Sequence, residues 1–489
     1  MRESGILMHI SSLPGPYGIG TMGKNAYEFV DFLKKSGQKV WQILPLSPTG
    51  YGDSPYQSCS AFAGNHYLID LETLMDNGLL EKQEAESFFW GENEEKADFG
   101  ALYENRSKVL RLAFGRFVPD EKYNKFVSEN ESWLSEYALF TAIKDSLGGI
   151  PWTEWPEELR LRDKKSLKEK REELRGDIAF KYFLQFEFFS QWEKLRGYAN
   201  ENGIKIVGDI PIYVPLDSAD VWAEPGEFLL DENLNPKRVA GCPPDSFSAD
   251  GQLWGNPIYD WDKMKENGFA WWKRRLGAAK HMYDIIRIDH FRGFESYWSI
   301  PAGDKTAMNG RWEQGPGMDF INAVKSIPDV DFIAEDLGYV TPEVRKLQED
   351  SGYPGMKVMQ FAFDSREAGN YLPHTYPENS VVYSGTHDNP TLVQWLSDVA
   401  ESDLEEGKKY LGLTEEEGLV KGLIRGCMAS NSRLCVILMQ DYLELGAEAR
   451  MNLPGTLSDK NWTWRAKPGF ASEELGKYIL EITNRFGRI

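Results

Sequence analysis

The chain contains short apolar runs, rich in β-branched residues, that are separated by longer amphipathic stretches. Runs of this length, bounded by Gly, Pro, Asn or Asp, are typical of strands buried on both faces. Helical patterns follow several of them, for example at 25–35 and 342–350. Alternation of strand and helix predicts βαβ units and a parallel sheet. The expected strands lie at 5–9, 39–44, 205–210, 285–289, 331–335, 357–363, 381–386 and 434–440.

Eight strands with intervening helices predict an α/β fold, a (β/α)8 TIM barrel, as one catalytic domain over residues 1–489. A plain barrel needs about 250 residues, so roughly half of the chain is additional. The extra sequence falls mainly at 65–202, which is charged and helix-like, and at 214–284, which is loop-rich with Pro and Gly. Both segments follow the C-terminal end of an expected strand. We therefore expect large, mainly helical insertions that wall the active face, with 214–284 forming a lid.

Three of the expected strands end on a carboxylate. The segments IIRIDHFRG, IAEDLG and SGTHDN place Asp289, Glu335 and Asp388 where apolar runs pass into Gly, His or Asn. The C-terminal ends of the strands form the catalytic face of a barrel. Glycosidic bond chemistry needs a nucleophilic carboxylate and a proton-donating one, so this set suits it. Taken singly, each acid also has a structural interpretation, as an arginine partner at 289 or a helix cap at 335 and 388.

The neighbours of two of these acids predict how they are charged. Arg287 and Asp289 are two residues apart on a strand, so their side chains share a face. A cation there is expected to lower the pKa of Asp289 and keep it ionised, as a nucleophile requires. Glu335 ends a buried strand beside Asp336. Burial among carboxylates is expected to raise the pKa of Glu335, which suits a general acid.

Composition and charge narrow the classes of partner. Acidic residues outnumber basic ones by 76 to 55, giving a formal net charge of −21, whereas sequence-independent nucleic-acid binding needs a basic face. No apolar run approaches the roughly 18 residues of a membrane span, and the apolar stretch at the N-terminus is too short for a signal peptide. The cysteines form no C-x-x-C pair and no zinc spacing with histidine. We expect a cytoplasmic protein with reduced thiols that binds neither nucleic acid nor membrane.

The order and wording of the motifs resemble the amylomaltase family, the 4-α-glucanotransferases of the wider α-amylase superfamily. The resemblance covers nearly the whole chain and is carried by SGILMHISSLPGPYGIG, WQILPLSPTGYGDSPYQSCSAFAGN, VGDIPIYV, GCPPDSFSADGQLWGNPIY, IRIDHFRG, AEDLG, GTHDN, MNLPGT and NWTWR. It implies that Asp289 is the nucleophile and Glu335 the acid/base. It also implies that Asp388 binds the reacting sugar and supports the transition state.

The same resemblance implies further contacts with a glucan, both around the reacting glucose unit and along the donor and acceptor cleft. The loop GCPPDSFSADGQLWG would be the lid over that cleft, and its Gly and Pro content favours a loop held by turns rather than by a strand ladder. An ordinary turn role for Ser54 and a packing role for Trp254 are alternatives. The residues implied to bind substrate are Ser54, Tyr56, Asp209, Trp254, Arg287, His290 and His387.

By this resemblance the expected activity is disproportionation of α-1,4-glucans, with neither a metal nor an organic cofactor. A glycosyl group on Asp289 would pass to the 4-hydroxyl of another glucan or of glucose, and two inversions give net retention. A glucan hydrolase differs only in that water attacks in the second step. Little sequence follows NWTWR, where amylases carry a β-sandwich, which favours the transferase. A noncatalytic glucan-binding barrel is a further alternative, and the three intact carboxylates argue against it.

Overall fold

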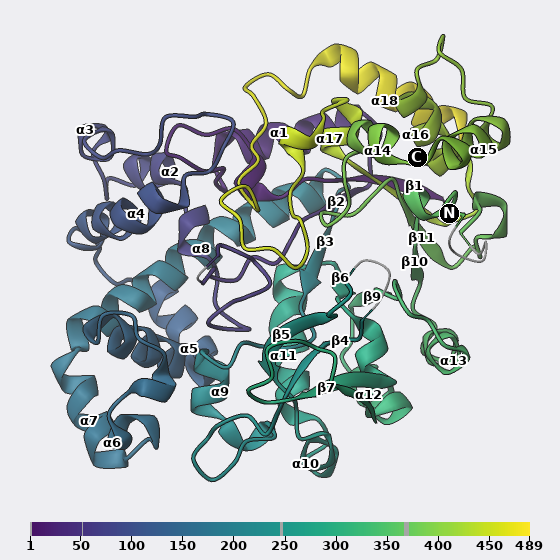
Figure 1. The fold of residues 1–489 in the computed structure, drawn as a ribbon. Helices are drawn as coiled ribbons and strands as arrows, with labels where there is room; N and C mark the ends of the chain where they lie inside the picture. Colours follow the sequence, from purple (N-terminus) through teal and green to yellow (C-terminus); the bar gives the residue numbers. More distant parts are fainter. Residues whose placement is uncertain (1, 51, 245–247, 366–370) are drawn as a thin grey trace.

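A closed barrel of eight parallel strands forms the centre of the computed structural model, which describes residues 2–50, 52–244, 248–365 and 371–489 (Figure 1). The order around the barrel is β1-β12-β11-β10-β9-β6-β3-β2, so each barrel strand lies beside the barrel strands that precede and follow it in sequence. The predicted TIM barrel is confirmed. The barrel strands are β1 (Glu3–Leu7), β2 (Val40–Gln42), β3 (Lys205–Ile210), β6 (Ile285–Ile288), β9 (Asp331–Ala334), β10 (Gly355–Val358), β11 (Ser380–Tyr383) and β12 (Leu434–Leu438).

All eight expected strands are present, and the first and the sixth are shifted towards the N-terminus. β10 ends at Val358, and the segment Met359–Phe361 that follows is a 3-10 helix. Both faces of the barrel strands are buried, which explains their continuous apolar runs. Alternate residues such as Val207 and Val436 pack together inside the barrel, while intervening residues such as Trp41 pack against the surrounding helices.

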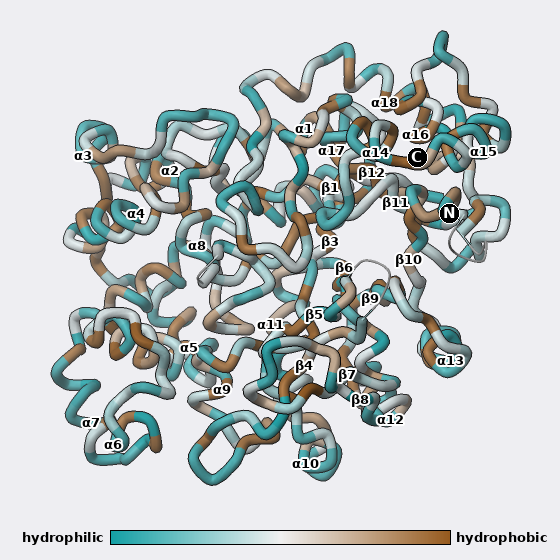
Figure 2. Tube along the Cα trace, viewed as in Figure 1, coloured by the Kyte–Doolittle hydropathy of each residue, from teal (hydrophilic) through white to brown (hydrophobic). Residues whose placement is uncertain are grey.

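Helices form a layer around the barrel. In α1 (Lys24–Lys35), Phe29 and Leu33 are four residues apart and both buried, so one face of the helix packs on the core. Going around the barrel, neighbouring helices contact each other in the order α18 (Glu473–Arg485), α1, α8 (Arg175–Glu201), α11 (Ala270–Met282), α12 (Gly317–Val324) and α13 (Pro342–Ser351). Hydrophobic segments gather in the strands, and outer helices such as α10 and α15 are mostly hydrophilic (Figure 2). The other helices after β6 are α12 (Gly317–Val324), α13 (Pro342–Ser351), α14 (Leu392–Asp398), α15 (Glu401–Leu411), α16 (Leu419–Ala429), α17 (Met439–Tyr442) and α18 (Glu473–Arg485).

Segment 65–202 is helical, as the sequence predicted, and lies to the left of the barrel in Figure 1. Its long helices α5 and α8 pack against each other, and α8 leads back to the barrel at β3. No helix in the described ranges is both long and apolar enough to cross a bilayer. The helices of the segment are α2 (Leu71–Asp76), α3 (Lys82–Glu86), α4 (Phe99–Phe114), α5 (Glu121–Ser146), α6 (Glu157–Arg160), α7 (Lys164–Glu173) and α8 (Arg175–Glu201).

Segment 214–284 has more regular structure than expected. It contains α9 (Ala219–Ala223), α10 (Trp261–Glu266), α11 (Ala270–Met282) and two strands, β4 (Arg238–Cys242) and β5 (Gln252–Pro257). These strands pair with β7 (Ser296–Pro301) and β8 (Arg311–Gln314), which follow β6, in an antiparallel sheet of order β5-β4-β7-β8.

The expectation that the loop GCPPDSFSADGQLWG is held by turns rather than by a ladder was therefore wrong for both of its ends. Gly241 pairs with Leu253, and Cys242 with Gln252, across β4 and β5. The central positions 245–247 lie outside the described residues. Local composition did not indicate these strands, because β4 also pairs with β7, which lies after the next barrel strand in the sequence.

Gly208 of β3 packs directly against the ring of Tyr283. A Cβ at position 208 would lie 2.1 Å from two ring atoms, far closer than van der Waals contact. Tyr283 is buried, so its ring has no open side into which it can move. We expect Gly208→Ala to lower the free energy of unfolding by about 1–3 kcal/mol, the usual cost of overpacking a core. Denaturant unfolding of the two proteins measures this difference.

Gly197 of α8 provides the matched control. A Cβ there would meet nothing within 4 Å, and alanine is favoured over glycine inside a helix by up to about 1 kcal/mol. Gly197→Ala should therefore leave the stability unchanged or raise it slightly. Equal stability of Gly208→Ala and the wild type would contradict the packing described for β3.

Candidate active site

The register of the barrel strands places polar residues side by side inside the barrel. Asp209 on β3 is paired with Arg287 on β6, which is paired in turn with Ile333 on β9. Asp289 is the first residue after β6. Its side chain lies on the same face as that of Arg287, as predicted from their spacing. Glu335 directly follows β9. Three neighbouring strands thus deliver charged groups to the C-terminal mouth of the barrel, where TIM-barrel enzymes carry their active sites.

Arg287 is shared between two carboxylates. Its Nη1 donates to both oxygens of Asp209, at 2.8 and 2.6 Å, and to Oδ1 of Asp289 at 3.0 Å. The side chains of Arg287 and Asp209 are 5% and 0% exposed, so each needs the other to compensate a buried charge. The Asp289 side chain keeps 30% exposure. Asp289 is therefore the carboxylate of this group that is open to a ligand.

The pKa of Asp289 is raised rather than lowered, which corrects the expectation drawn from the spacing to Arg287. The pKa is raised to about 8: burial raises it most, Arg287 lowers it in part, and the carboxylates of Asp209, Glu335 and Asp388 also raise it. The physical reason is that burial outweighs the attraction of Arg287, and the neighbouring carboxylate of Asp209 adds to the rise. Solvent at the exposed side of Asp289 screens these charges and moderates the effect.

Backbone amides hold the Glu335 carboxylate in place. Oε2 accepts from the N–H of His290 at 2.7 Å, and Oε1 accepts from the N–H of Leu337 at 2.8 Å. His290 has φ 52°, a left-handed conformation uncommon for a residue with a Cβ, and this turn positions its amide beside Glu335. Burial raises the pKa of Glu335, although Arg287 and the two amides lower it in part. The predicted direction is confirmed.

Two carboxyl groups with raised pKa values therefore meet in one cleft. Asp289 and Glu335 repel each other when both are ionised, which is one of the causes of the raised pKa of Asp289. Such a pair still holds one shared proton at pH values above the usual carboxyl range, and the two groups titrate together. This is the protonation state that a nucleophile and an acid need together.

Tyr56 and His387 form the wall across from β6 and β9. The Tyr56 hydroxyl donates to Oδ2 of Asp209 at 2.8 Å, and its ring is stacked on His387 with centroids 4.9 Å apart and planes inclined by 17°. Trp462 lies 5.8 Å from both rings. Burial lowers the pKa of His387, so this histidine is a neutral hydrogen-bonding group at physiological pH.

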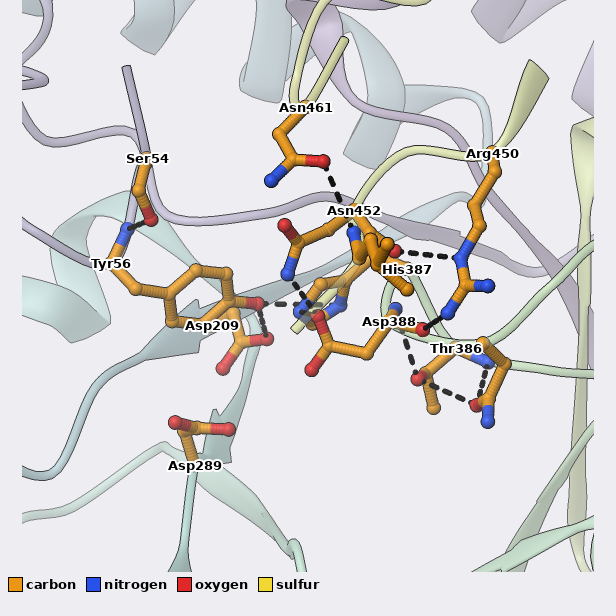
Figure 3. Close-up of polar contacts among 12 residues, drawn as sticks. Ser54, Tyr56, Asp209, Asp289, Thr386, His387, Asp388, Arg450, Asn452 and Asn461 are labelled. Atoms are coloured by element: carbon orange, nitrogen blue, oxygen red, sulfur yellow. Dashed lines mark hydrogen bonds and ion pairs between the residues drawn. The ribbon is translucent and has the colours of Figure 1, made fainter. Parts of the chain in front are cut away.

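Asp388 is held from the C-terminal loop. Its Oδ1 accepts from Nδ2 of Asn452 at 2.6 Å, and its backbone carbonyl accepts from Arg450 at 2.7 Å. Figure 3 shows the Asp388 carboxylate turned toward the side of the site that carries Tyr56 and Asp289. Thr391 caps α14, so Asp388 does not have the capping role that was its structural alternative. Thr341 likewise caps α13, which removes the capping alternative for Glu335.

Comparison with known proteins now identifies the family. The family model described as 4-alpha-glucanotransferase matches residues 8–471. The chain belongs to this family. It is 50% identical to a 4-alpha-glucanotransferase from Clostridium butyricum over 98% of this chain and all of that one, and 47% identical to one from Thermus thermophilus over 99% of both. A solved amylomaltase from Streptococcus agalactiae, in complex with acarbose, superposes with a TM-score of 0.96 at 40% identity over the full length of both chains.

Family membership makes the chain a glycosyl-transferring enzyme that acts on α-1,4-glucans with retention of configuration. The mouth of the barrel brings together most of the residues implied to bind substrate. Tyr56, Asp209, Arg287 and His387 are linked by hydrogen bonds or ring stacking. Their contacts with one another are shown, and their individual contacts with sugar remain predictions.

The other three residues implied to bind substrate lie at the edges of this group. The Trp254 ring packs edge-on against His290 at 4.8 Å, beside the amide that holds Glu335. Nε2 of His290 is buried and has no hydrogen-bond partner among the described residues. Ser54 Oγ accepts the N–H of Tyr56 at 3.2 Å, a turn contact that orients Tyr56.

Sequence reasoning missed four residues of the site. Asn452, Arg450 and Trp462 come from the MNLPGT and NWTWR region, which supported the family resemblance without indicating particular side chains. The fourth is Asp441 on α17, which is fully buried. It accepts from Ser384 Oγ at 2.6 Å and from the N–H of Leu392 at 2.7 Å. Asp441 thus holds both ends of the loop that carries His387 and Asp388.

Removal of this buried clamp should affect activity and stability together. Asp441→Ala leaves the Leu392 amide and the Ser384 hydroxyl without their acceptor, at a cost of about 1–3 kcal/mol in the free energy of unfolding. A small displacement of Asp388 should lower kcat by at least about tenfold. The measurements are thermal unfolding, and the rate of maltotriose disproportionation well below the melting temperature.

Asp76→Ala is the matched control because Asp76 is exposed at the end of α2, far from this loop in the sequence. It should change neither quantity appreciably. A folded Asp441→Ala protein with wild-type kcat would show that the loop keeps Asp388 in place without this clamp.

Proposed function

We propose that Asp289 attacks the anomeric carbon of an α-1,4-glucan while Glu335 protonates the departing oxygen. The observation that carries this assignment is the placement of the two carboxyls on adjacent paired strands, one bound to a cation and the other held by two amides. Attack forms an ester between Asp289 and the sugar and releases the first product. In a retaining pair of this kind the two carboxyl groups lie about 5–5.5 Å apart when glucan is bound.

The second half-reaction uses the same groups in reversed roles. Once Asp289 is esterified its negative charge is gone, and so is the repulsion that it exerted on Glu335. The pKa of Glu335 then falls, and its carboxylate takes the proton of the incoming 4-hydroxyl. That oxygen attacks the anomeric carbon, and the ester bond to Asp289 breaks. Two inversions restore the original configuration.

The wall opposite β6 and β9 is suited to hold the sugar that reacts. Asp388 is open to the cleft and fixed by Asn452, so its charge stabilises the positive charge that develops at the anomeric carbon. Tyr56 and His387 present polar groups and a stacked aromatic surface beside it. Asp209 and Arg287 complete the floor of this subsite.

The segments that surround the barrel mouth complete the proposal. Segment 214–284 would act as a lid that keeps water from the glycosyl ester, with Trp254 on the acceptor side, and 65–202 would support the opposite wall.

The substrates would be maltooligosaccharides as donors and acceptors, with glucose as an acceptor. Free thiols at Cys59, Cys427 and Cys435 support a cytoplasmic location.

Two carboxyl variants test the assignment. Asp289→Asn should lose activity many thousandfold, because the nucleophile is gone. Glu335→Gln should lose activity with maltotriose but still react with a maltosyl fluoride, whose leaving group needs little protonation. The assay follows products: wild type should convert maltotriose into glucose and longer chains. Production of shorter chains alone would indicate a hydrolase, and near-normal Asp289→Asn activity would refute the assignment.

The raised pKa of Asp289 predicts the pH dependence. The reactive free enzyme holds one proton on the pair, so kcat/KM should fall as the pH rises through about 8 and that proton is lost. In Glu335→Gln with maltosyl fluoride no acid is needed, and the repulsion from Glu335 is absent. Reaction should then increase with pH through a lower pKa, that of Asp289 alone. A wild-type profile that stays flat to about pH 10 would contradict the shared proton.

A further inference from the structure

Two exposed aromatic rings lie side by side near the barrel mouth. Trp312 of β8 is 37% exposed and Tyr339, in the loop after β9, is 68% exposed. Their centroids are 6.3 Å apart and their planes are inclined by only 20°. Parallel rings in face-to-face contact are closer than this, so the two rings are offset sideways. They form a stepped aromatic platform rather than a closed sandwich.

The platform is supported from behind by Arg292. Its guanidinium lies 3.8 Å from the Trp312 ring centroid and 5.8 Å from that of Tyr339. Arg292 is itself fixed by the Ser296 hydroxyl at 3.0 Å and by the carbonyl of Tyr339. Trp298 packs edge-on against Trp312 at 5.2 Å. The rings are thus ordered in advance, which lowers the entropic cost of binding a ligand to their open side.

Chain connectivity places the platform on the Glu335 side of the cleft. Arg292 follows Asp289 by three residues, and Tyr339 follows Glu335 by four, a reach of at most about 14 Å. Tyr56, His387 and Asp388 instead come from the loops after β2 and β11, on other strands of the barrel. Glu335 protonates the leaving oxygen, so the acceptor must enter on its side. A glucan that leaves the catalytic centre in this direction passes towards Trp312 and Tyr339.

We propose that Trp312 and Tyr339 form a remote acceptor subsite that stacks on glucose units of an α-1,4-glucan, beyond the units next to the reacting bond. The inference rests on the proposed roles of Asp289 and Glu335. Flat aromatic faces match the apolar faces of sugar rings, and the strongly acidic chain favours a neutral ligand over an anionic one. The subsite makes the enzyme select long acceptors over glucose.

The test varies the length of the acceptor while the donor stays fixed. Maltosyl fluoride is the donor, and glucose and maltohexaose are compared as acceptors by their kcat/KM values in Trp312→Ala and Tyr339→Ala. Loss of one stacking contact should lower kcat/KM for maltohexaose about five- to tenfold, which corresponds to roughly 1 kcal/mol. The loss for glucose should be at least threefold smaller. Trp312→Phe should recover most of the preference for maltohexaose.

Two controls separate the possible failures. Phe89→Ala removes an aromatic ring with 57% exposure from the helical segment 65–202 and should leave the ratio of the two acceptors unchanged. Tyr339→Ala leaves the contact between Arg292 and Trp312 in place, so it tests the subsite even if Trp312→Ala unfolds. An equal loss for both acceptors in Tyr339→Ala, or no loss, would overturn the subsite. Failure of the wild type to transfer from maltosyl fluoride would instead refute the proposed function.

Discussion

A single buried guanidinium, that of Arg287, holds the carboxylates of Asp209 and Asp289 together at the mouth of the barrel. The pairing of β3 with β6 puts Arg287 and Asp209 beside each other, so the ion pair is a direct consequence of strand register. Two charges at this depth are tolerated only as a pair. Asp209 also accepts from Tyr56, which stacks on His387. The ion pair therefore connects the catalytic strands to the wall that binds the sugar.

Burial is the main reason why the site retains a proton, and the carboxylate of Asp209 adds to the effect. Asp209 takes both of the shorter contacts with Arg287, and burial and the neighbouring carboxylates raise the pKa of Asp289. The resulting pair can provide a nucleophile and an acid in the first step, and a base once the nucleophile is esterified. Asp209 thus acts on the chemistry through Arg287.

The sequence predicted the barrel and the three acids because both follow from local pattern. Each buried strand is a continuous apolar run. Asp289 and Glu335 directly follow such runs, and Asp388 lies in the loop after β11, so position relative to the strand indicates the catalytic face. Two features lacked a local signal. The antiparallel sheet joins β4 and β5 to strands beyond β6, and Asp441 and Asn452 reach the loop of Asp388 from distant segments. The direction of the Asp289 pKa shift also needed the third residue, Asp209, whose position depends on the register between strands.

The central claim is that glucan becomes covalently bound to Asp289. The most direct measurement is peptide mapping by mass spectrometry after reaction with a maltosyl fluoride whose terminal 4-hydroxyl is blocked, followed by rapid acid quenching. The account predicts one added mass of the blocked maltosyl group on the peptide that contains IIRIDHFRG, with fragment ions that place it on Asp289. An adduct on the peptide that contains Glu335 or Asp388 would contradict it. So would complete donor turnover with inverted products and no adduct.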